Sequence, residues 1–151
     1  QEDPRSGALL IIDADHFKSI NDRLGHDCGD QALKLIAQAI KGQLRGSDIV
    51  GRIGGEEFGV FLPGVDPSQS WLVAEGIRRR IREMDFSPDG RACPLSVSIG
   101  GTSFSGPTTY EAIFSAADRR LYAAKSNGRD QVSFDPAEAA LVSQPSATTV
   151  H

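Results

Sequence analysis

The sequence has little of what marks several protein classes. Its 151 residues include only two cysteines, Cys28 and Cys93, which lie far apart and form no Cys-x-x-Cys or Cys/His cluster, so we expect free, buried thiols in a reducing cytoplasm rather than a disulfide. No apolar run approaches the roughly 20 residues that cross a bilayer, and no signal peptide opens the chain. A net charge of −4 provides no basic surface. We therefore expect a cytoplasmic domain that binds no nucleic-acid polymer.

The composition is ordinary for one globular domain. Hydrophobic residues make up 39% and charged residues 24%, and a chain of this length buries roughly 70% of its unfolded surface. Apolar runs alternate with helical periodicities, which favours an α/β (α+β) domain with a mixed sheet covered by helices. The predicted strands are 8–12, 48–53, 59–63, 94–100 (half-buried) and 131–134, and the predicted helices are 16–24, 30–44 with Asp30 as N-cap, 67–84 and 110–126. Residues 1–7 are predicted to be loose, and 135–151 to be a mobile tail rich in Ala, Ser, Thr and Pro.

The most informative segment is Gly-Gly-Glu-Glu-Phe at residues 54–58. It lies between the predicted strands 48–53 and 59–63, so the glycines and Glu56 fall at the tip of a hairpin. Glycine permits a positive φ and lets a ligand phosphate approach closely. Adjacent carboxylates repel each other in a turn, but they suit a hard cation such as Mg²⁺. A hairpin that merely exposes two solvated acids is the alternative at this point.

Asp13 ends the first predicted strand, and strand ends are where sheets of this class present functional side chains. If that strand neighbours the hairpin, Asp13 and Glu56 meet at one point. Two carboxylates from separate elements, together with phosphate oxygens, hold Mg²⁺ on a nucleotide, and the metal then neutralises phosphate charge and lowers the pKa of an attacking hydroxyl. A helix cap or an exposed loop acid is an equally simple interpretation of Asp13 alone.

Several motifs in a fixed order carry a family resemblance. The segments 12–22 and 25–30, the Gly-Gly-Glu-Glu-Phe hairpin, and the segments 95–100 and 117–130 resemble the catalytic domain of diguanylate cyclases of the GGDEF family, of which GGEEF is a common active variant. The resemblance implies a central mixed, mostly antiparallel sheet flanked by helices, similar to class III nucleotide cyclases and polymerase palms. It also implies that two GTP molecules are joined into cyclic di-GMP with loss of two pyrophosphates.

The resemblance implies a role for each polar residue of these motifs. Asp13, Glu56 and the backbone carbonyl of Ala14 match the family's ligands for Mg²⁺ or Mn²⁺, and Glu57 matches a further ligand. The family assigns removal of the ribose 3′-hydroxyl proton to the position of Glu56, but a metal-bound carboxylate is a weak base, so we expect the metal to contribute more of the activation. Lys18 matches the catalytic cation that stabilises developing phosphate charge. The substrate-binding positions are Phe17, Lys18, Asn21, His26, Asp30, Gly54, Gly55, Lys125 and Arg129.

Guanine and triphosphate each have a chemical counterpart in that set. Guanine offers two adjacent donors and a carboxylate accepts both, which suits Asp30 beside Asn21, although the N-cap interpretation of Asp30 competes with this role. Lys125 and Arg129 match positions that reach the β- and γ-phosphates. Each cation alone would also fit an ordinary solvated helix face, and His26 would fit an ordinary surface histidine.

A second constellation is the pair Arg45 and Asp48. It stands at the offset from the hairpin where the family has an inhibitory site for cyclic di-GMP. An arginine fork suits phosphate or the guanine Hoogsteen edge, and an aspartate suits the Watson–Crick edge. An arginine of the third predicted helix usually completes the site, and we expect Arg80 among the three arginines 78–80. Gly76 replaces another arginine frequent in the family, which is expected to weaken the site. A helix-ending arginine and a turn aspartate are the alternative.

The resemblance also sets expectations for organisation and partners. Members usually carry a helix before the first strand, so we expect a truncated start at 1–7, a catalytic domain at 8–134 and the tail at 135–151. One domain binds one GTP, so catalysis requires a homodimer. Attachment to a membrane or a sensory module would come only through upstream segments. Two alternatives stay open: a catalytically silent module that binds cyclic di-GMP or GTP, and a GTP-binding regulator of a partner phosphodiesterase domain.

Overall fold

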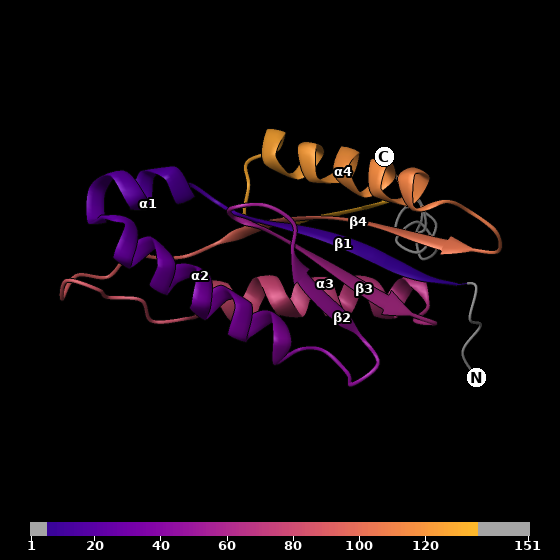
Figure 1. Ribbon diagram of the computed structural model, residues 1–151, viewed down its shortest axis with the longest axis horizontal. Coiled ribbons are helices and arrows are strands. Elements are labelled where there is room, and N and C mark those ends of the chain that lie inside the picture. Colours follow the sequence, from indigo (N-terminus) through magenta and orange to yellow (C-terminus); the bar gives the residue numbers. More distant parts are fainter. Residues whose placement is uncertain (1–5, 136–151) are drawn as a thin grey trace, which may run out of the picture.

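A computed structural model describes residues 6–135, whose strands form one five-stranded sheet in the order β2-β3-β1-β4-β5 (Figure 1). β1 pairs antiparallel with both β3 and β4, β2 pairs antiparallel with β3, and β5 runs parallel to β4. This mixed, mostly antiparallel sheet with flanking helices confirms the predicted fold class. The strands are β1 (Ser6–Ala14), β2 (Ile49–Arg52), β3 (Glu57–Pro63), β4 (Val97–Ser105) and β5 (Val132–Asp135), and the helices are α1 (Phe17–Leu24), α2 (His26–Lys41), α3 (Pro67–Arg82) and α4 (Tyr110–Ser126).

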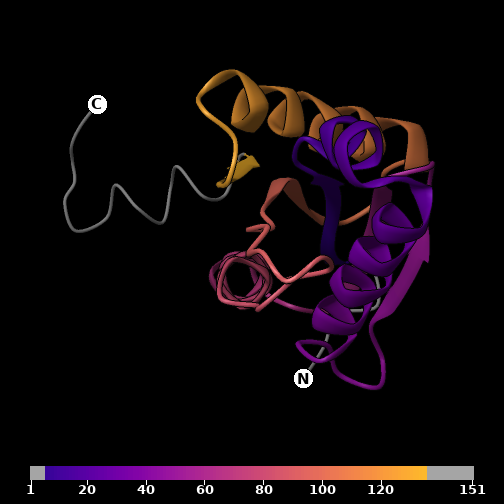
Figure 2. The ribbon, with the colours of Figure 1, turned by 90° about the vertical axis from the view of Figure 1, so that its left-hand side faces the viewer.

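β1 is the centre of the sheet and is buried on both faces, because helices cover both. Leu10 and Ile12 belong to the larger core beneath α2 and α3, whereas Leu9 and Ile11 pack with residues of α4. The end-on view in Figure 2 shows α4 on one side of the sheet and α2 and α3 on the other. The uninterrupted apolar run at 8–12 therefore reflects a two-sided apolar environment.

Polar caps account for where the two long outer helices begin. The carboxylate of Asp66 accepts a hydrogen bond from the backbone N–H of Gln69 at 2.8 Å, and Pro67 occupies the first turn of α3. The hydroxyl of Thr109 accepts from the N–H of Ala112 at 3.1 Å at the start of α4. The predicted helices at 67–84 and 110–126 agree closely with α3 and α4.

The start of α2 differs from the prediction. The N-cap role of Asp30 is wrong, because α2 begins at His26 and Asp30 lies inside the helix. Gly25, with a φ of 90°, makes the sharp turn between α1 and α2, a conformation that favours glycine. Position 29, inside α2, requires glycine because a Cβ there would collide with the side chain of Asn21 on α1. The absence of a Cβ at Gly29 lets the two helices pack, and the carboxylate of Asp30 does not cap the helix.

β4 is buried rather than half-buried, and it begins at Val97 instead of Pro94. Its period-two pattern arises because Ile99 faces the core under α2 and α3, whereas Gly100 lies under α4. A small residue is needed on that second side, since a Cβ at Gly100 would collide with the backbone of Leu121 in α4. The alternation of apolar and small residues therefore reflected helix packing, not exposure to solvent.

The predictions for the chain ends and the cysteines hold in part. Ser6 and Gly7 belong to β1, so the loose segment predicted at 1–7 is wrong for these two residues. Residues 1–5, and the predicted tail from 136 onward, lie outside the described residues.

Both cysteines are free thiols; Cys93 is buried as expected, whereas Cys28 is only partly buried. None of the helices in the described part of the chain has the length and apolarity to span a membrane.

Replacing Gly100 by alanine should destabilise the domain by about 1–3 kcal/mol, because the added methyl group forces α4 away from β4. Urea unfolding followed by circular dichroism measures the change. Gly51→Ala in β2 is the matched control, since nothing lies within 4 Å of a Cβ at that position. Equal stabilities of the two variants would contradict the close contact between α4 and β4.

Candidate functional site

Asp13 is a carboxylate buried at the end of the central strand. It is 2% exposed and lies opposite Glu57 of β3 and Ser98 of β4 in the sheet register. Its Oδ2 forms an ion pair with the ammonium of Lys125 from α4, while its Oδ1 is buried without a hydrogen-bond partner among the described residues. A buried carboxylate oxygen without a partner is costly, which indicates that the site is built to receive a ligand there.

The tip of the β2–β3 hairpin reaches the end of β1. The backbone N–H of Ala14 donates to the carbonyl of Glu56 at 3.1 Å, which brings Glu56 beside Asp13. Neither Gly54 nor Gly55 uses the positive φ that glycine permits. A Cβ on either glycine would meet nothing within 4 Å, so the approach to the hairpin tip is open.

Carboxylates outnumber cations around this point. Burial raises the pKa of Glu56 above its ordinary value and the charge of Asp13 raises it further, while Lys125 partly offsets both effects. The pKa of Glu57 is likewise raised by burial and then by Asp13, with Lys125 opposing and Asp118 of α4 adding to the rise. A cation placed here would relieve the repulsion among these acids.

The donor set fits a divalent cation when main-chain or ligand oxygens complete the coordination. Nowhere in residues 6–135 do three His, Cys, Asp or Glu side chains form a group that could hold a metal by themselves. Asp13 and Glu56 nevertheless present hard carboxylate oxygens at one point, and the Oδ1 of Asp13 has no competing partner in this part of the chain. Mg²⁺ is commonly held by one or two carboxylates together with substrate phosphates, so the residues present fit that ion.

An open cleft of about 460 Å³ lies between the start of α1 and the hairpin tip, a size typical of ligand pockets. The side chain of Lys18 on α1 is 88% exposed, and its 3.2 Å ion pair with Asp22 is a weak surface contact that a phosphate can replace. The residues that line the cleft are His16, Phe17, Lys18, Ser19, Asp22, Glu56 and Arg129.

Asn21 and Asp30 lie at the junction of α1 and α2. Asn21 contacts the position of Gly29, and its Oδ1 is buried without a hydrogen-bond partner within residues 6–135. Asp30 follows Gly29 on α2 and is exposed, as is His26 one turn before it. The junction therefore combines a buried amide oxygen, without a partner in this part of the chain, with an exposed carboxylate.

The loop after α4 is fixed by Asp15, a residue whose role the sequence did not predict. Asp15 is 7% exposed and accepts hydrogen bonds from the hydroxyls of Ser96 (2.7 Å) and Ser98 (2.6 Å) and from the N–H of Asp130 (3.0 Å). The sequence does show Asp15 as the second acid of Asp-Ala-Asp at 13–15. The pattern alone, however, does not distinguish a structural aspartate from a metal ligand.

Arg45 and Asp48 form a closed pair between α2 and β2. The guanidinium of Arg45 donates to Oδ1 of Asp48 from Nη2 (2.7 Å) and Nε (3.1 Å), and the backbone N–H of Arg45 donates to Oδ2 (2.7 Å). Nη2 also donates to the carbonyl of Pro63 at 2.9 Å. The Asp48 side chain is 2% exposed and that of Arg45 is 43% exposed, so the arginine forms the accessible side of the pair.

Arg80 is the candidate arginine of α3 that turns toward α2. It lines a hollow of about 170 Å³ together with Gln43 at the end of α2, whereas Arg78 and Arg79 pair with Glu75 on their own helix. Neither member of the Arg-x-x-Asp pair lines this hollow, so the structure does not gather the three predicted inhibitory residues into it.

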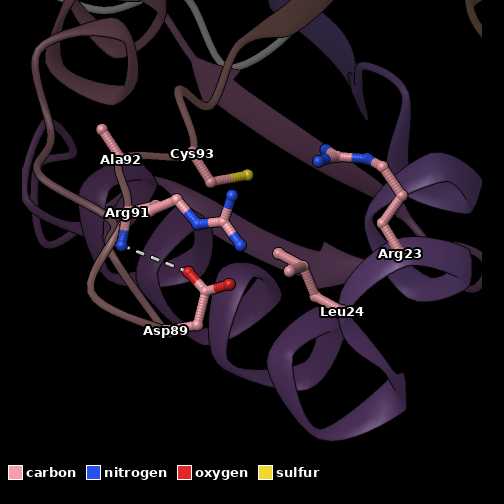
Figure 3. A pocket seen from close by; sticks show the side chains of 6 residues that line it. All are labelled: Arg23, Leu24, Asp89, Arg91, Ala92 and Cys93. Carbon is pink, nitrogen blue, oxygen red and sulfur yellow. Dashed lines mark hydrogen bonds between the residues drawn. The ribbon is translucent and has the colours of Figure 1, made fainter.

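A further hollow of about 340 Å³ lies beside the end of α1 (Figure 3). It contains none of the predicted site residues, and we do not include it in the candidate site. The backbone N–H of Arg91 donates to the carboxylate of Asp89 at 3.2 Å on its wall. The lining residues are Arg23, Leu24, Asp89, Arg91, Ala92 and Cys93.

Comparison with known proteins gives consistent results at the level of family and fold. Residues 1–131 match the family described as "Diguanylate cyclase, GGDEF domain". The diguanylate cyclase DgcP of Pseudomonas aeruginosa is 41% identical to this chain over 124 residues, which are 82% of this chain and 18% of that relative. The chain therefore spans less than a fifth of the length of this curated relative.

Solved structures share the fold. The diguanylate cyclase SiaD of P. aeruginosa, in complex with its activator SiaC, matches with a TM-score of 0.82 and 37% identity, over 86% of this chain and 50% of that one. The GGDEF domain of DgcB from Caulobacter crescentus, in complex with c-di-GMP, matches with a TM-score of 0.81 and 29% identity, over 85% of this chain and 77% of that one.

Glu56 and Glu57 should make the fold less stable as the pH rises. Their pKa values in the folded protein are raised above the ordinary 4.5, so the stability that their protonated forms contribute is lost as the pH rises through the folded-state values. Glu56→Gln removes one of these acids. In EDTA, its melting temperature should match that of the wild type near pH 4 and exceed it by a few degrees at pH 7.

Thermal unfolding at pH values from 4 to 8 measures this difference. Glu83→Gln, an exposed acid at the end of α3, is the control and should follow the wild type. A Glu56→Gln curve that runs parallel to the wild type at every pH would show that the crowding of acids has no energetic consequence.

Proposed function

The chain belongs to the GGDEF family of diguanylate cyclase domains, and on that premise we propose that it condenses two molecules of GTP into cyclic di-GMP and two pyrophosphates. The observation that carries the proposal is the meeting of Asp13 and Glu56 at the head of the cleft, where one Asp13 oxygen is buried without a partner among the described residues. Such an oxygen suits a cation that bridges protein and phosphates.

We assign Mg²⁺ or Mn²⁺ to the carboxylates of Asp13 and Glu56 and the backbone carbonyl of Ala14, with Glu57 as a further ligand. When bound, the metal supplies neutralisation of phosphate charge and lowers the pKa of the ribose 3′-hydroxyl. Glu56 is the carboxylate assigned to accept the hydroxyl proton, and it does so as a weak base. Lys125, which neutralises Asp13 in this structure, becomes available for phosphate once a cation takes over that task.

Three cations are assigned to the triphosphate. Lys18 of α1 lines the cleft with an exposed side chain, so its ammonium can stabilise the charge that develops on the phosphate oxygens. Arg129 lines the same cleft, and its planar fork suits bidentate contact with the β- or γ-phosphate. Lys125 of α4 pairs with Asp13 and does not itself line the cleft, so its contact with phosphate requires release from Asp13.

Guanine is assigned to the junction of α1 and α2. The carboxylate of Asp30 can accept from the N1–H and the exocyclic amine of guanine, and Asn21 adds an amide that has no partner for its Oδ1 in the described chain. Adenine lacks that pair of donors. Phe17 packs beneath the base, and His26 borders the pocket.

Two copies of the domain must face each other for this reaction. Each site binds one GTP, and each 3′-hydroxyl attacks the α-phosphate held by the other copy, so two bonds form and two pyrophosphates leave. The exchange is reciprocal, which suits a two-fold symmetric homodimer. A single domain should bind GTP without making product.

Product inhibition is assigned to Arg45 and Asp48, with Arg80 completing the site. The ion pair holds the guanidinium of Arg45 in a fixed direction while its side chain stays 43% exposed, which lowers the ordering cost of contacting a phosphate or the guanine Hoogsteen edge. A silent module that binds cyclic di-GMP without making it would need the same pair but not the metal site.

Asp13→Asn should abolish product formation by the chain when a two-stranded coiled coil fused to its N-terminus makes it dimeric. Loss of a metal-ligand oxygen removes several kcal/mol of transition-state stabilisation, so we expect a fall of at least about a hundredfold in the initial rate. Chromatography of cyclic di-GMP formed from GTP and Mg²⁺ measures the rate.

Asp118→Asn is the matched control, because Asp118 acts on Glu57 only through its charge and lies outside the ligand set. We expect this variant to retain most of the activity. A wild-type dimer that makes no cyclic di-GMP, or an Asp13→Asn dimer as active as the wild type, would refute the proposed reaction.

Arg45→Ala should weaken inhibition by the product, because the variant loses the guanidinium assigned to the ligand. The concentration of added cyclic di-GMP that halves the initial rate should rise at least about tenfold. Arg79→Ala, which removes an exposed arginine outside the site, should leave that concentration unchanged. Tight binding of cyclic di-GMP by a wild-type dimer that turns over no GTP would instead favour the silent module.

A further inference from the structure

We propose that Asp130 is a positioning residue that fixes the backbone of Arg129, and so the direction of its guanidinium, for gripping the triphosphate of the substrate. The inference rests on the proposed function in one respect, the binding of a nucleoside triphosphate in the cleft that Arg129 lines. It gives Asp130 and the helix α3 a part in substrate binding that no sequence motif indicated.

The backbone at 128–130 has an unusual conformation. Its φ angles are 119° at Gly128, 65° at Arg129 and 49° at Asp130. Glycine adopts this region freely and aspartate tolerates it, but arginine rarely does. A conformation of this kind persists only where the surrounding structure holds it. Here it places Arg129, and not Asp130, on the wall of the cleft.

Arg129 makes two backbone hydrogen bonds of its own, from its N–H to the carbonyl of Ala124 and to its carbonyl from Nε2 of Gln131, both at 3.0 Å. Asp130 adds the contacts that tie this segment to α3 and to the end of β1. Its Oδ1 accepts from Nη1 of Arg78 at 2.8 Å and its Oδ2 accepts from Nε of Arg82 at 3.0 Å, both from α3. Its backbone N–H donates to the buried carboxylate of Asp15 at 3.0 Å. A single residue is thus tied by its side chain to a helix and by its backbone to the end of the central strand.

The α3 side of this link is itself fixed. Nε and Nη2 of Arg78 donate to the two carboxylate oxygens of Glu75 at 2.9 Å and 2.7 Å, which leaves Nη1 directed at Asp130. The Arg78 side chain is 19% exposed, so these charged contacts are screened less than those of surface pairs. Arg79, the next residue, pairs with Glu75 and makes no contact with Asp130.

An arginine fork binds phosphate best when its direction is set before the ligand arrives, because less entropy is then lost on binding. Without the two ion pairs of Asp130, the 128–130 segment would be held only by its backbone hydrogen bonds, and the ligand would have to order more of Arg129. The affinity that is lost should be that of the contacts between Arg129 and the β- and γ-phosphates. Binding of the guanine, assigned to Asn21 and Asp30, which Asp130 does not contact, should be unaffected.

The test compares two ligands on the intact chain, the α,β-methylene analogue of GTP, which cannot release pyrophosphate, and GMP, which lacks the β- and γ-phosphates. Calorimetry with Mg²⁺ gives the affinity ratio of the analogue to GMP. Asp130→Asn keeps a side chain that tolerates a positive φ but removes the charge, and it should lower the ratio about tenfold. A general loss of stability would weaken both ligands alike and leave the ratio unchanged.

Two arginines of α3 provide a matched pair for the same measurement. Arg82→Gln removes a contact to Asp130 and should lower the ratio, whereas Arg79→Gln removes the same charge from the same helix without that contact and should not. Arg129→Gln should lower the ratio at least as much as Asp130→Asn. Combining these two substitutions should cause no further fall, because Asp130 acts through Arg129.

Two outcomes contradict the positioning role alone, and a third also overturns the proposed function. If Arg129→Gln lowers the ratio but Asp130→Asn and Arg82→Gln do not, the positioning role is wrong and the proposed function stands. If the effects of Arg129→Gln and Asp130→Asn multiply, Asp130 acts elsewhere and the positioning role is again wrong. If the wild type itself does not prefer the analogue to GMP, the cleft does not grip a triphosphate, and both the positioning role and the proposed function are overturned.

Discussion

A carboxylate buried at the end of a central strand needs a positive partner, and the candidate site is arranged around this requirement of Asp13. Asp13 is almost fully buried, yet only one of its oxygens is neutralised, by Lys125 from the opposite end of the chain. Glu56 and Glu57 of the β2–β3 hairpin crowd the same point, where burial and then the charge of Asp13 raise the pKa values of both. Removing the charge altogether would be cheaper for folding, so its retention fits a site that waits for a cation.

The antiparallel sheet is what brings these groups together. β1 lies between β3 and β4, so a residue at its end is flanked by the hairpin on one side and by the start of β4 on the other. The small residue Gly100 lets α4 lie close to the sheet, and α4 in turn carries Lys125 to Asp13 and leads into the loop of Arg129. Fold and site are therefore linked through a few close contacts rather than through one motif.

Much of this could be predicted from sequence, because long periodic segments and the hairpin signal depend on local patterns. Asp30 was misjudged because capping propensity is local, whereas α2 actually starts at a glycine turn and packs through Gly29 onto α1. The burial of β4 was missed because serine and glycine beneath a helix look like a solvent-facing side. The anchoring role of Asp15 depends on three donors far away in the sequence, which no local pattern contains.

The central claim is that Asp13 and Glu56 share a divalent cation with a guanosine triphosphate. A crystal structure of the chain grown with Mg²⁺ and the α,β-methylene analogue of GTP tests it most directly. The account predicts density for an ion between the carboxylates of Asp13 and Glu56, with the ammonium of Lys125 moved from Asp13 onto a phosphate. Bound nucleotide with Lys125 still on Asp13, and no ion between the two acids, would contradict it.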